Sequence, residues 1–480
     1  MTLHEKPMRE ERDSLGARAV PADAYYGVQT DRARENFDLS GVALGDFPAL
    51  VRALAMVKKA AAIANHASGL LDAEKLRAIV GACEDVIAGD LDKAFVVDVF
   101  QGGAGTSSNM NANEVIANRA LERLGRAKGD YAALHPNDDV NMSQSTNDVY
   151  PTAVRVAVLL SRAELQAALA RLIAAFEAKG REFAPIVKIG RTQLQDAVPI
   201  TLGQEFEAFA ATLREDVSRL EEVALLFREV NLGGTAVGTR INATPEYAER
   251  AIAELSRIAG LPLVAARDLM EASWDAGAFV TFSGILRRIA VKLSKICNDL
   301  RLLSSGPRSG LGEIRLPPVQ PGSSIMPGKV NPVIPESVNQ VCYQVIGNDL
   351  AVTMAAEAGQ LQLNAFEPLM AYDLLSSMRL LGRAMNGLAT RCVAGIEADA
   401  ERCRAGAESS ISLATALVPV VGYARAAEIA RLALISGRSV MDATGDLAID
   451  AQALRDILDP MRMASPPRPR DERRGDADAR

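Results

Sequence analysis

The chain has 480 residues, of which 49% are apolar, 24% charged and only 4% aromatic, and its formal net charge is -7. This length favours two or three domains, and a composition rich in alanine and leucine but poor in aromatics favours helices over a sandwich or barrel. The acidic balance argues against nucleic acid as a partner, because phosphates attract basic surfaces.

No export or membrane signal is recognisable. The first 13 residues are dense with charge and lack the apolar core of a signal peptide, and no run is apolar and long enough to span a bilayer. The cysteines are widely spaced and form no Cys-x-x-Cys pair, so the sequence indicates neither zinc nor redox chemistry. We therefore expect a cytoplasmic protein whose thiols are reduced. The five cysteines are Cys83, Cys297, Cys342, Cys392 and Cys403.

The N-terminal part reads as turns followed by helices. Residues 1–45 carry proline, glycine and aspartate, which predicts irregular structure, and helical patterns follow at 49–66 and 71–87. The next segment, Gln101–Asn111, is a glycine-rich turn that leads into a helical run. It lacks the Gly-Lys-Ser/Thr ending of a phosphate loop, and no strand pattern precedes it, so a nucleotide site is not favoured. Its glycines instead allow Thr106 and Ser107 to approach a small anion near a helix N-terminus.

A second polar cluster, His135–Asp148, precedes a series of long helical patterns. Its ordinary interpretation is a loop that caps the helix after Pro151, and a binding role is compatible with this. In the long patterns, apolar residues recur at spacings of three and four. Helices of about 27 residues are roughly 40 Å long and typical of bundles, which often bury part of their apolar seam against other subunits. The three patterns cover 152–179, 203–229 and 273–303.

Two further polar turns interrupt the helices. The first is Gly190–Asp196, and the second is Pro321–Pro332, where prolines and glycines prevent a continuous helix. The second turn carries serine, lysine and asparagine, which are donors suited to a carboxylate, although on composition alone a surface connection is the commoner explanation. A helical pattern follows from Glu336 to about Leu363, shorter helices lie beyond about residue 400, and the tail 465–480 is expected to be disordered.

With these four clusters in view, the chain resembles the aspartase/fumarase superfamily. The run Gly322–Pro332, with the sequence GSSIMPGKVNP, is highly specific to that superfamily, and the resemblance extends from about residue 9 to 460 with the clusters in the family's order. The segment His135–Val140 is equally at home in fumarases. The segments that look most like the aspartase family, where class II fumarases usually differ, are Pro21–Thr30, Gln101–Ser107 and Val352–Asn364.

The resemblance implies a mostly α, three-domain fold with a long central helical bundle. In this family four subunits share the bundle, and each active site is built from three chains, so the expected partners are a small dicarboxylate and copies of the same chain. Val418 departs from the pattern, because relatives usually have asparagine there. The expected divisions are an N-terminal domain at 1–143, the bundle at 144–400, a small helical domain at 401–464 and the tail at 465–480.

The implied reaction is the reversible removal of ammonia from L-aspartate to give fumarate. Its difficult step takes a proton from the carbon beside the side-chain carboxylate and leaves an enediolate with a second negative charge. By resemblance the base is Ser323, on a mobile loop that closes over the substrate. A serine needs its alkoxide stabilised, and none of the three histidines of the chain is a suitable partner, which disfavours a Ser-His-Asp hydrolase. We expect Lys329 and loop amides to activate Ser323.

The resemblance also implies the remaining substrate contacts, and such preorganised donors usually supply the largest share of catalysis. A secondary anion site corresponds to His135, Asn137 and Asp138. No cofactor or metal is required, and activation by a divalent cation through the His135 cluster stays open. Donors to the rearranged carboxylate would be Thr106, Ser107, Ser145, Thr146 and Ser324. The other carboxylate would meet Thr192, Lys329 and Asn331, with Asn147 near the amine.

Gln193 is the most informative single position for the leaving group. Fumarases have histidine here, paired with a glutamate that corresponds to Glu336, and that pair handles protons on the departing water. Glutamine does not titrate, but the amine of aspartate departs already protonated and needs no acid. The position therefore favours loss of ammonia over loss of water, although some aspartases retain histidine.

Three other functions compete with this interpretation. The nearest is a class II fumarate hydratase, which interconverts fumarate and L-malate. A catalytically silent relative, such as the members of the superfamily recruited as crystallins, is disfavoured because Ser323, Lys329 and Asn331 are intact. A helical scaffold that binds protein partners would show no activity with any dicarboxylate.

Overall fold

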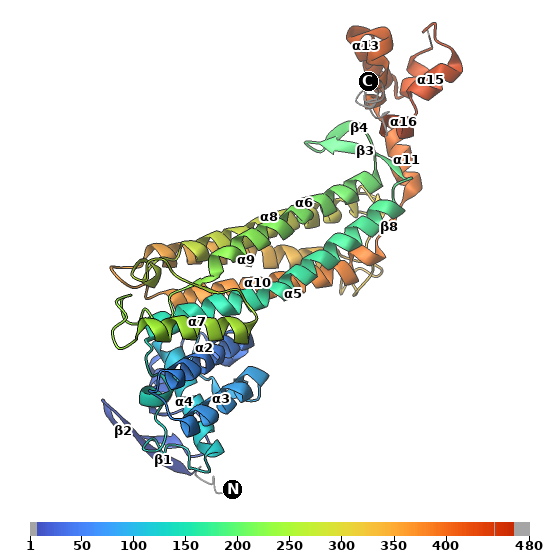
Figure 1. Ribbon diagram of the computed structural model, residues 1–480. Coiled ribbons are helices and arrows are strands. Elements are labelled where there is room, and N and C mark those ends of the chain that lie inside the picture. Colours follow the sequence, from blue (N-terminus) through green and yellow to red (C-terminus); the bar gives the residue numbers. More distant parts are fainter. Residues whose placement is uncertain (1–6, 446, 465–480) are drawn as a thin grey trace, which may run out of the picture. The chain divides into compact units, whose positions relative to one another are not determined.

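A computed structural model describes residues 7–445 and 447–464 of the chain (Figure 1). Helices dominate these residues, and their short strands form four two-stranded sheets, so the predicted mostly α fold is confirmed. The predicted disordered tail, 465–480, lies outside the described residues.

The described residues group into two compact units. Unit 1 contains the chain up to Ala168 together with Asp216–Val291 and Gln340–Arg383. Unit 2 contains Leu169–Glu215, Lys292–Asn339 and the residues from Ala384 onward. The three-domain division expected from the sequence is not tested by this grouping and stays a prediction.

Unit 1 begins with a hairpin and a short helix, so the prediction of irregular structure over 1–45 was wrong at 8–13, 16–21 and 28–36. Strands β1 (Met8–Asp13) and β2 (Gly16–Pro21) pair antiparallel, and α1 (Val28–Asn36) follows. Carboxylates replace the usual cap at the start of α1, because Glu114 accepts the amides of Gly27, Gln29 and Thr30. These contacts lie far apart in sequence, which is why local patterns did not indicate the helix.

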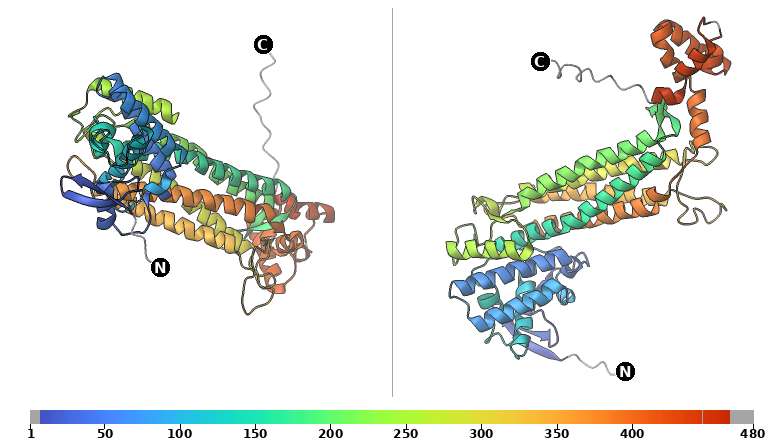
Figure 2. Two further views of the ribbon diagram at one scale, coloured as in Figure 1. Left: turned by 90° about the horizontal axis from the view of Figure 1, so that it is seen from below. Right: turned by 45° about the vertical axis from the view of Figure 1, so that its right-hand side comes forward.

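The helices predicted next are confirmed. They are α2 (Pro48–Ala67) and α3 (Ala73–Ala88), and α4 (Thr106–Arg123) follows the glycine-rich turn. Six of the eight alanines of α2 are fully buried, which lets α2 pack closely against both α3 and α7 (Pro245–Ala259) (Figures 1 and 2).

The five longest described helices each contribute residues to both units. Four of them confirm the long helical patterns of the sequence, and the fifth, α10, was not predicted. Their bounds are α5 (Thr146–Glu182), α6 (Leu202–Ala224), α8 (Gly277–Leu303), α9 (Val333–Glu357) and α10 (Glu367–Arg391).

Aromatic side chains fill the space between the long helices within each unit. In unit 1, the ring of Phe227 lies 5.4 Å from that of Phe279 and 5.2 Å from that of Phe282. In unit 2, Phe206 packs against Phe176 and Phe183 with edge-to-face or tilted geometry. Such pairs contribute about 0.5–1.5 kcal/mol beyond their buried area, so they help to fix the register of the helices.

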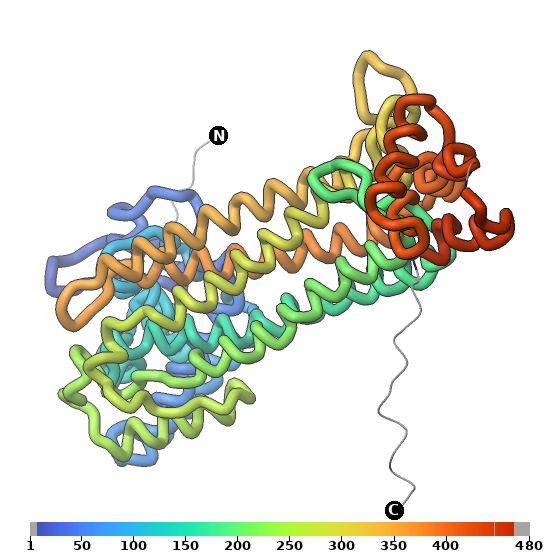
Figure 3. Tube along the Cα trace, turned by 90° about the horizontal axis from the view of Figure 1, so that it is seen from above, coloured from blue at the N-terminus to red at the C-terminus, as the bar shows by residue number. Residues whose placement is uncertain are grey.

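Unit 2 also carries a hairpin, β3 (Val187–Thr192) with β4 (Gln195–Thr201), and a group of shorter helices. A core of its own, which includes Leu417, Ile429 and Val440, holds the helices between residues 418 and 457 together. Figure 3 shows the long connection between α8 and α9, residues 304–332, and a two-residue strand at 314–315 lies within it. The short helices are α11 (Ala400–Ser409), α12 (Val418–Val421), α13 (Tyr423–Ser436), α14 (Val440–Ala443), α15 (Ala451–Ile457) and α16 (Pro460–Ala464). The two-residue strands are β5 (Glu229–Val230) and β6 (Val264–Ala265) in unit 1, and β7 (Ile314–Arg315) and β8 (Glu397–Ala398) in unit 2.

Candidate active site

In unit 1, the glycine-rich turn delivers two of the predicted substrate residues to the start of α4. Gly105 has a φ of 87°, and a Cβ atom there would lie 2.4 Å from the ring of Tyr150, so only glycine fits. The turn leaves Thr106 exposed and Ser107 half-buried. The Thr106 hydroxyl donates to the carbonyl of Gly103 at 2.7 Å. Both hydroxyls therefore lie at a helix N-terminus, where anions are favoured.

The start of α5 carries Ser145, Thr146 and Asn147, and Asp148 holds this turn in place. The buried carboxylate of Asp148 accepts the amide of Ser145 at 3.0 Å and the amides of Gly233 and Thr235 at 2.9 Å each. Burial raises the pKa of Asp148 to about 6, although these three amides lower it. Asp148 thus ties the 145–147 turn to the loop that contains residues 231–243.

Pro151 lies inside α5, although the sequence had predicted that the helix starts after it. Helix α5 begins at Thr146, and a proline at position 151 provides no N–H for the carbonyl of Asn147. The side chain of Asn231 supplies the missing donor at 3.0 Å. In return, the Asn147 amide group donates to the carbonyl of Ala236 at 2.8 Å. This exchange fixes the orientation of Asn147.

A buried lysine also stabilises the residues just before this turn. Lys58 is fully buried, and its ammonium donates to Asn141 at 2.8 Å and to Gln144 at 2.9 Å. Burial lowers the pKa of Lys58 to about 7, while the charge of Asp148 raises it. Asn109 of α4 joins this network, because its amide donates to Asn141 and to the hydroxyl of Thr146, both at 3.1 Å. The network therefore connects the two predicted substrate segments of unit 1.

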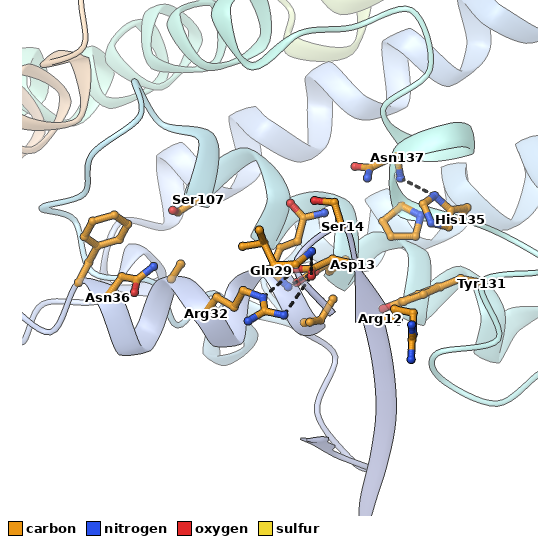
Figure 4. Close-up of a pocket in the computed structure, with 16 residues that line it drawn as sticks. Arg12, Asp13, Ser14, Gln29, Arg32, Asn36, Ser107, Tyr131, His135 and Asn137 are labelled. Carbon is orange, nitrogen blue, oxygen red and sulfur yellow. Dashed lines mark hydrogen bonds and ion pairs between the residues drawn. The ribbon is translucent and has the colours of Figure 1, made fainter. Parts of the chain in front are cut away.

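Two of the three residues predicted as a secondary anion site, His135 and Asn137, line a cavity of about 540 Å³ in unit 1 (Figure 4). The Nδ1 atom of His135 accepts the backbone amides of Asn137 at 3.1 Å and of Asp138 at 3.2 Å. Ser107 lines the same cavity but lies apart from His135 and Asn137. Arg32, a basic residue of the lining, is paired with Asp13 at 2.9 Å. Asp138 faces a second cavity, of about 380 Å³, which Ser145 also lines.

In unit 2, the turn predicted at 190–196 is the tip of the β3–β4 hairpin. Thr192 pairs with Gln195, and the two residues between them, Gln193 and Leu194, have φ angles of 53° and 62°. Positive φ at both central positions is the type I′ turn that matches the twist of a hairpin. Thr192 and Gln193 are both exposed at this tip.

Hydrogen bonds among its own residues close the 321–332 loop. The amide of Gly322 donates to the carbonyl of Lys329 at 2.8 Å, and the side chain of Asn331 donates to the carbonyl of Gly322 at 2.7 Å. A Cβ atom at residue 322 would lie 2.5 Å from the Lys329 oxygen, so this closure requires glycine. Lys329 is exposed, and it forms no ion pair with any described residue.

Within this loop, Ser323 occupies a local cradle of backbone amides. Its Oγ atom accepts the N–H of Ile325 at 3.2 Å and the N–H of Met326 at 3.0 Å. Ser323 is half-buried, whereas the neighbouring Ser324 is exposed. Two amides directed at one hydroxyl oxygen stabilise a negative charge that develops there.

The structure therefore gathers the predicted residues into two sets. Unit 1 brings together Ser145, Thr146 and Asn147 and links Thr146 to α4, the helix that starts with Thr106 and Ser107. Unit 2 carries Thr192 and Gln193 on the hairpin, and Ser323, Ser324, Lys329 and Asn331 on the loop, with the half-buried Glu336 in the first turn of α9.

The sequence analysis missed the supporting residues Lys58, Asn109 and Asn231 and the loop at 231–243. A signal was present in that loop, because Gly233, Gly234 and Gly238 lie close together in the sequence. A Cβ atom at Gly238 would lie 2.4 Å from the amide nitrogen of Met270, so the loop is packed too closely for a side chain there.

The described residues contain no group of three histidine, cysteine, aspartate or glutamate side chains that could hold a metal ion. All five cysteines are buried, and none of them forms a disulfide bond within the described residues. None of the described helices combines the length and apolarity required to cross a membrane.

Comparison with known proteins defines the class. Two family models match the chain, one described as "Lyase" over residues 16–347 and one described as "Fumarase C C-terminus" over residues 413–465. The first match spans more than half of the chain, so the fold and these matches together define a lyase.

Curated relatives define the family within that class. Aspartate ammonia-lyase from Pseudomonas aeruginosa is 61% identical over 460 residues, which cover 95% of this chain and 97% of that protein. Aspartate ammonia-lyase from Escherichia coli is 50% identical over 461 residues, or 96% of each chain. The chain belongs to the aspartate ammonia-lyase family, which confirms the resemblance described above.

Solved structures share the fold of this chain. The structure described as fumarate lyase:delta crystallin from Brucella melitensis bound to cobalt is 77% identical to this chain. Its TM-score is 0.94, and the match covers 96% of this chain and all of that one. A class II fumarase from Schistosoma mansoni is only 35% identical, yet its TM-score is 0.91 over 96% of this chain and 99% of that one. The fold is thus common to enzymes with different leaving groups, and the distinction between them must come from individual residues.

Proposed function

We propose that the protein catalyses the reversible deamination of L-aspartate to fumarate and ammonia, with Ser323 as the base. The observation that carries this proposal is the pair of amides, from Ile325 and Met326, directed at the Ser323 oxygen. Near-full-length similarity to aspartate ammonia-lyases supports the substrate and the reaction.

In the proposed reaction, removal of a proton comes before loss of the amine. The Ser323 alkoxide removes the proton from the carbon beside the side-chain carboxylate, and the electron pair moves into that carboxylate to form an enediolate. The pair then returns to form the carbon–carbon double bond as the carbon–nitrogen bond breaks. A free serine hydroxyl is a poor base, so the loop amides and the charge of Lys329 must favour the alkoxide.

Two groups of donors would hold the substrate. In the proposal, Lys329, Asn331 and Thr192 bind one carboxylate. The enediolate is stabilised by Thr106, Ser107, Ser145, Thr146 and Ser324, and Asn147 lies near the amine. The interactions of Asp148 and Asn231 support the second group, because they fix the turn before its substrate arrives.

The hairpin tip would decide which group leaves. Gln193 is exposed there and does not titrate, which suits an amine that departs already protonated and disfavours loss of water. We infer that no cofactor is needed, that His135, Asn137 and Asp138 form a secondary anion site, and that the enzyme works in the cytoplasm.

We also propose a homotetramer in which neighbouring chains complete each site. The support comes from α9, where apolar side chains are exposed at helical spacing: Tyr343 is 57% exposed, Leu350 62% and Met354 65%. Large apolar side chains aligned on one face of a long helix are typical of a surface that binds another subunit.

A direct assay tests the proposed reaction against the nearest alternative. Purified protein is incubated with L-aspartate or with L-malate, and the appearance of fumarate is followed in the ultraviolet together with released ammonia. We expect fumarate and ammonia in equal amounts from L-aspartate, and no fumarate from L-malate. Fumarate from L-malate alone would instead assign the chain as a class II fumarate hydratase. No reaction with either substrate would reject the proposal.

A further inference from the structure

Four charged side chains form a linear series of ion pairs at the β3–β4 hairpin of unit 2. Lys188 lies 2.7 Å from the carboxylate of Glu205 and 2.7 Å from that of Glu313, and Arg191 lies 2.7 Å from the other oxygen of Glu313. The side chains of Lys188 and Glu313 are only 2% and 5% exposed. Two positive and two negative charges balance, which buried ions require to offset their lost hydration.

Glu313 is also fixed through its backbone. Its amide donates to the carbonyl of Leu303 at the end of α8, and its carbonyl accepts the amide of Asp399 at 2.9 Å. The next two residues, Ile314 and Arg315, form β7 and pair with β8. The backbone at Glu313 is therefore fixed by contacts with Leu303, with Asp399 and with β8. Its carboxylate provides a rigid contact for the hairpin.

The cluster joins two segments that the proposed function places in the site. Lys188 and Arg191 belong to β3, which ends at Thr192 and leads to Gln193 at the tip. On the other side, the chain runs from Glu313 through Pro317 into the 321–332 loop. Pro317 packs so closely on Gly395 that a Cβ atom there would lie 2.6 Å from its ring. The hairpin tip and the loop are therefore both connected to Glu313, the tip through the Glu313 carboxylate and the loop through the backbone.

We propose that Glu313 is a positioning residue that sets the hairpin tip, with Thr192 and Gln193, in place for the reaction. This inference rests on the proposed function, which gives Thr192 a carboxylate of the substrate. Glu313 touches no substrate and acts through Arg191 and Lys188. Its loss would displace the tip while the Ser323 cradle, built from the loop's own amides, remains intact.

Glu205 provides a matched comparison within the same cluster. It also pairs with Lys188, at 2.7 Å, but it lies near the start of α6, and within the described part of the chain it forms no ion pair or hydrogen bond with Arg191 or with the segment before the loop. Both Glu205→Gln and Glu313→Gln remove one carboxylate from Lys188. Only the second removes the attachment of Arg191, so the two variants separate a positioning role from a general loss of buried charge.

The test measures kcat and KM for L-aspartate in Glu313→Gln, Glu205→Gln and the wild type. We expect KM to rise at least tenfold in Glu313→Gln with kcat within threefold, because displacing Thr192 removes a contact with a substrate carboxylate that is made equally in the ground state and the transition state. Glu205→Gln should stay within twofold on both constants, and Glu313→Asp should recover part of the lost KM. Equal losses in the two glutamine variants, or an unchanged KM in Glu313→Gln, would overturn the proposal.

A second variant, Arg191→Gln, and hydrogen exchange complete the test. If Glu313→Gln does not fold, Arg191→Gln breaks the same attachment from the less buried side and should raise KM equally; an unchanged KM there overturns the proposal. Hydrogen exchange of the folded variants does not depend on turnover. Faster exchange over 187–201 in Glu313→Gln but not in Glu205→Gln supports the attachment even if the wild type fails to deaminate aspartate, and unchanged exchange contradicts it.

Discussion

The two sets of site residues are held in opposite ways. In unit 1, the 145–147 turn rests on the buried groups Asp148, Lys58 and Asn231. In unit 2, the 321–332 loop is exposed over most of its length, and its closure depends on a few bonds among its own residues, such as that from Gly322 to Lys329. Exposed segments with few buried contacts are those that open locally at low cost. The contrast separates the proposed substrate surface, which is preformed, from the segment that carries the proposed base and is able to move.

From this contrast we expect that substitutions in the 321–332 loop affect the turnover of L-aspartate without changing the free energy of unfolding. Substitutions of the buried groups that support the 145–147 turn should affect both.

The largest effect is expected from Lys329→Met. This change removes the exposed charge proposed to hold a carboxylate and to favour the Ser323 alkoxide, so kcat/KM should fall about a thousandfold, which corresponds to about 4 kcal/mol. Thermal unfolding should not change, because the side chain is exposed. Steady-state kinetics and a melting curve provide the measurement. Lys295→Met, which alters an exposed lysine on α8, is the control and should leave kcat/KM near that of the wild type.

The next effect concerns pH and a buried carboxyl group in unit 1. Burial raises the pKa of Glu367 from 4.5 to about 8, and Arg155 only partly opposes this. The folded state therefore holds a proton that the unfolded state releases between about pH 4.5 and 8. The free energy of unfolding contributed by this group is fully present below pH 4.5 and is lost as the pH rises through 8. We expect a loss of about 3 kcal/mol, below the upper bound of about 5 kcal/mol that the shift implies.

Denaturant unfolding of the wild type and of Glu367→Gln at several pH values measures this effect. Glutamine does not titrate, so the variant should lack this component of the pH dependence, and the stability difference between the two proteins should change with pH. Parallel stability curves from pH 5 to 8 would show that Glu367 ionises normally.

A smaller loss is expected from Asp148→Asn. The new amide group would face backbone N–H donors of Ser145, Gly233 or Thr235 and leave at least one of them unsatisfied, at a cost of about 2 kcal/mol. KM should rise as well, because the 145–147 turn loses its support. Asp98→Asn is the control, since Asp98 accepts the amides of Leu39, Ser40 and Gly41 in a similar way but does not support this turn. It should reduce stability without changing KM.

The smallest effect is expected at the hairpin tip, where Leu194→Gly should stabilise the protein by about 0.5–1 kcal/mol. Leu194 has a φ of 62° and is 69% exposed, so glycine relieves a strained backbone while little burial is lost. Chemical denaturation measures the gain. Leu70→Gly, at an exposed leucine outside the set of positive φ residues, should instead be slightly destabilising.

The sequence predicted best where a pattern repeats locally. The long helices follow from apolar residues at spacings of three and four, and Gly322–Pro332 was recognisable because its glycines and donors are contiguous. The sequence failed where distant residues complete a local structure. Helix α1 depends on Glu114, and the start of α5 depends on Asn231, which supplies the donor that Pro151 lacks. Lys58 lies in an alanine-rich helix, and nothing nearby in the sequence indicated its buried partners.

The proposed site residues were predicted from motifs. The residues that hold them in place were found only in the structure. Thr192 and Gln193 were predicted as a polar turn, but a pattern of polar residues does not show that both central φ angles are positive or that Glu313 holds the strand beneath them. Such contacts depend on the tertiary fold, which brings together residues more than 100 positions apart.

The most direct test of the contrast is Ser323→Ala, measured by turnover of L-aspartate and by calorimetric binding of succinate, an unreactive dicarboxylate. The account predicts that turnover falls by about a thousandfold, because the base is lost, while the Kd for succinate stays within about threefold of the wild type. Turnover within tenfold of the wild type would contradict Ser323 as the base. A Kd that weakens as much as turnover falls would contradict the separation of substrate binding from proton removal.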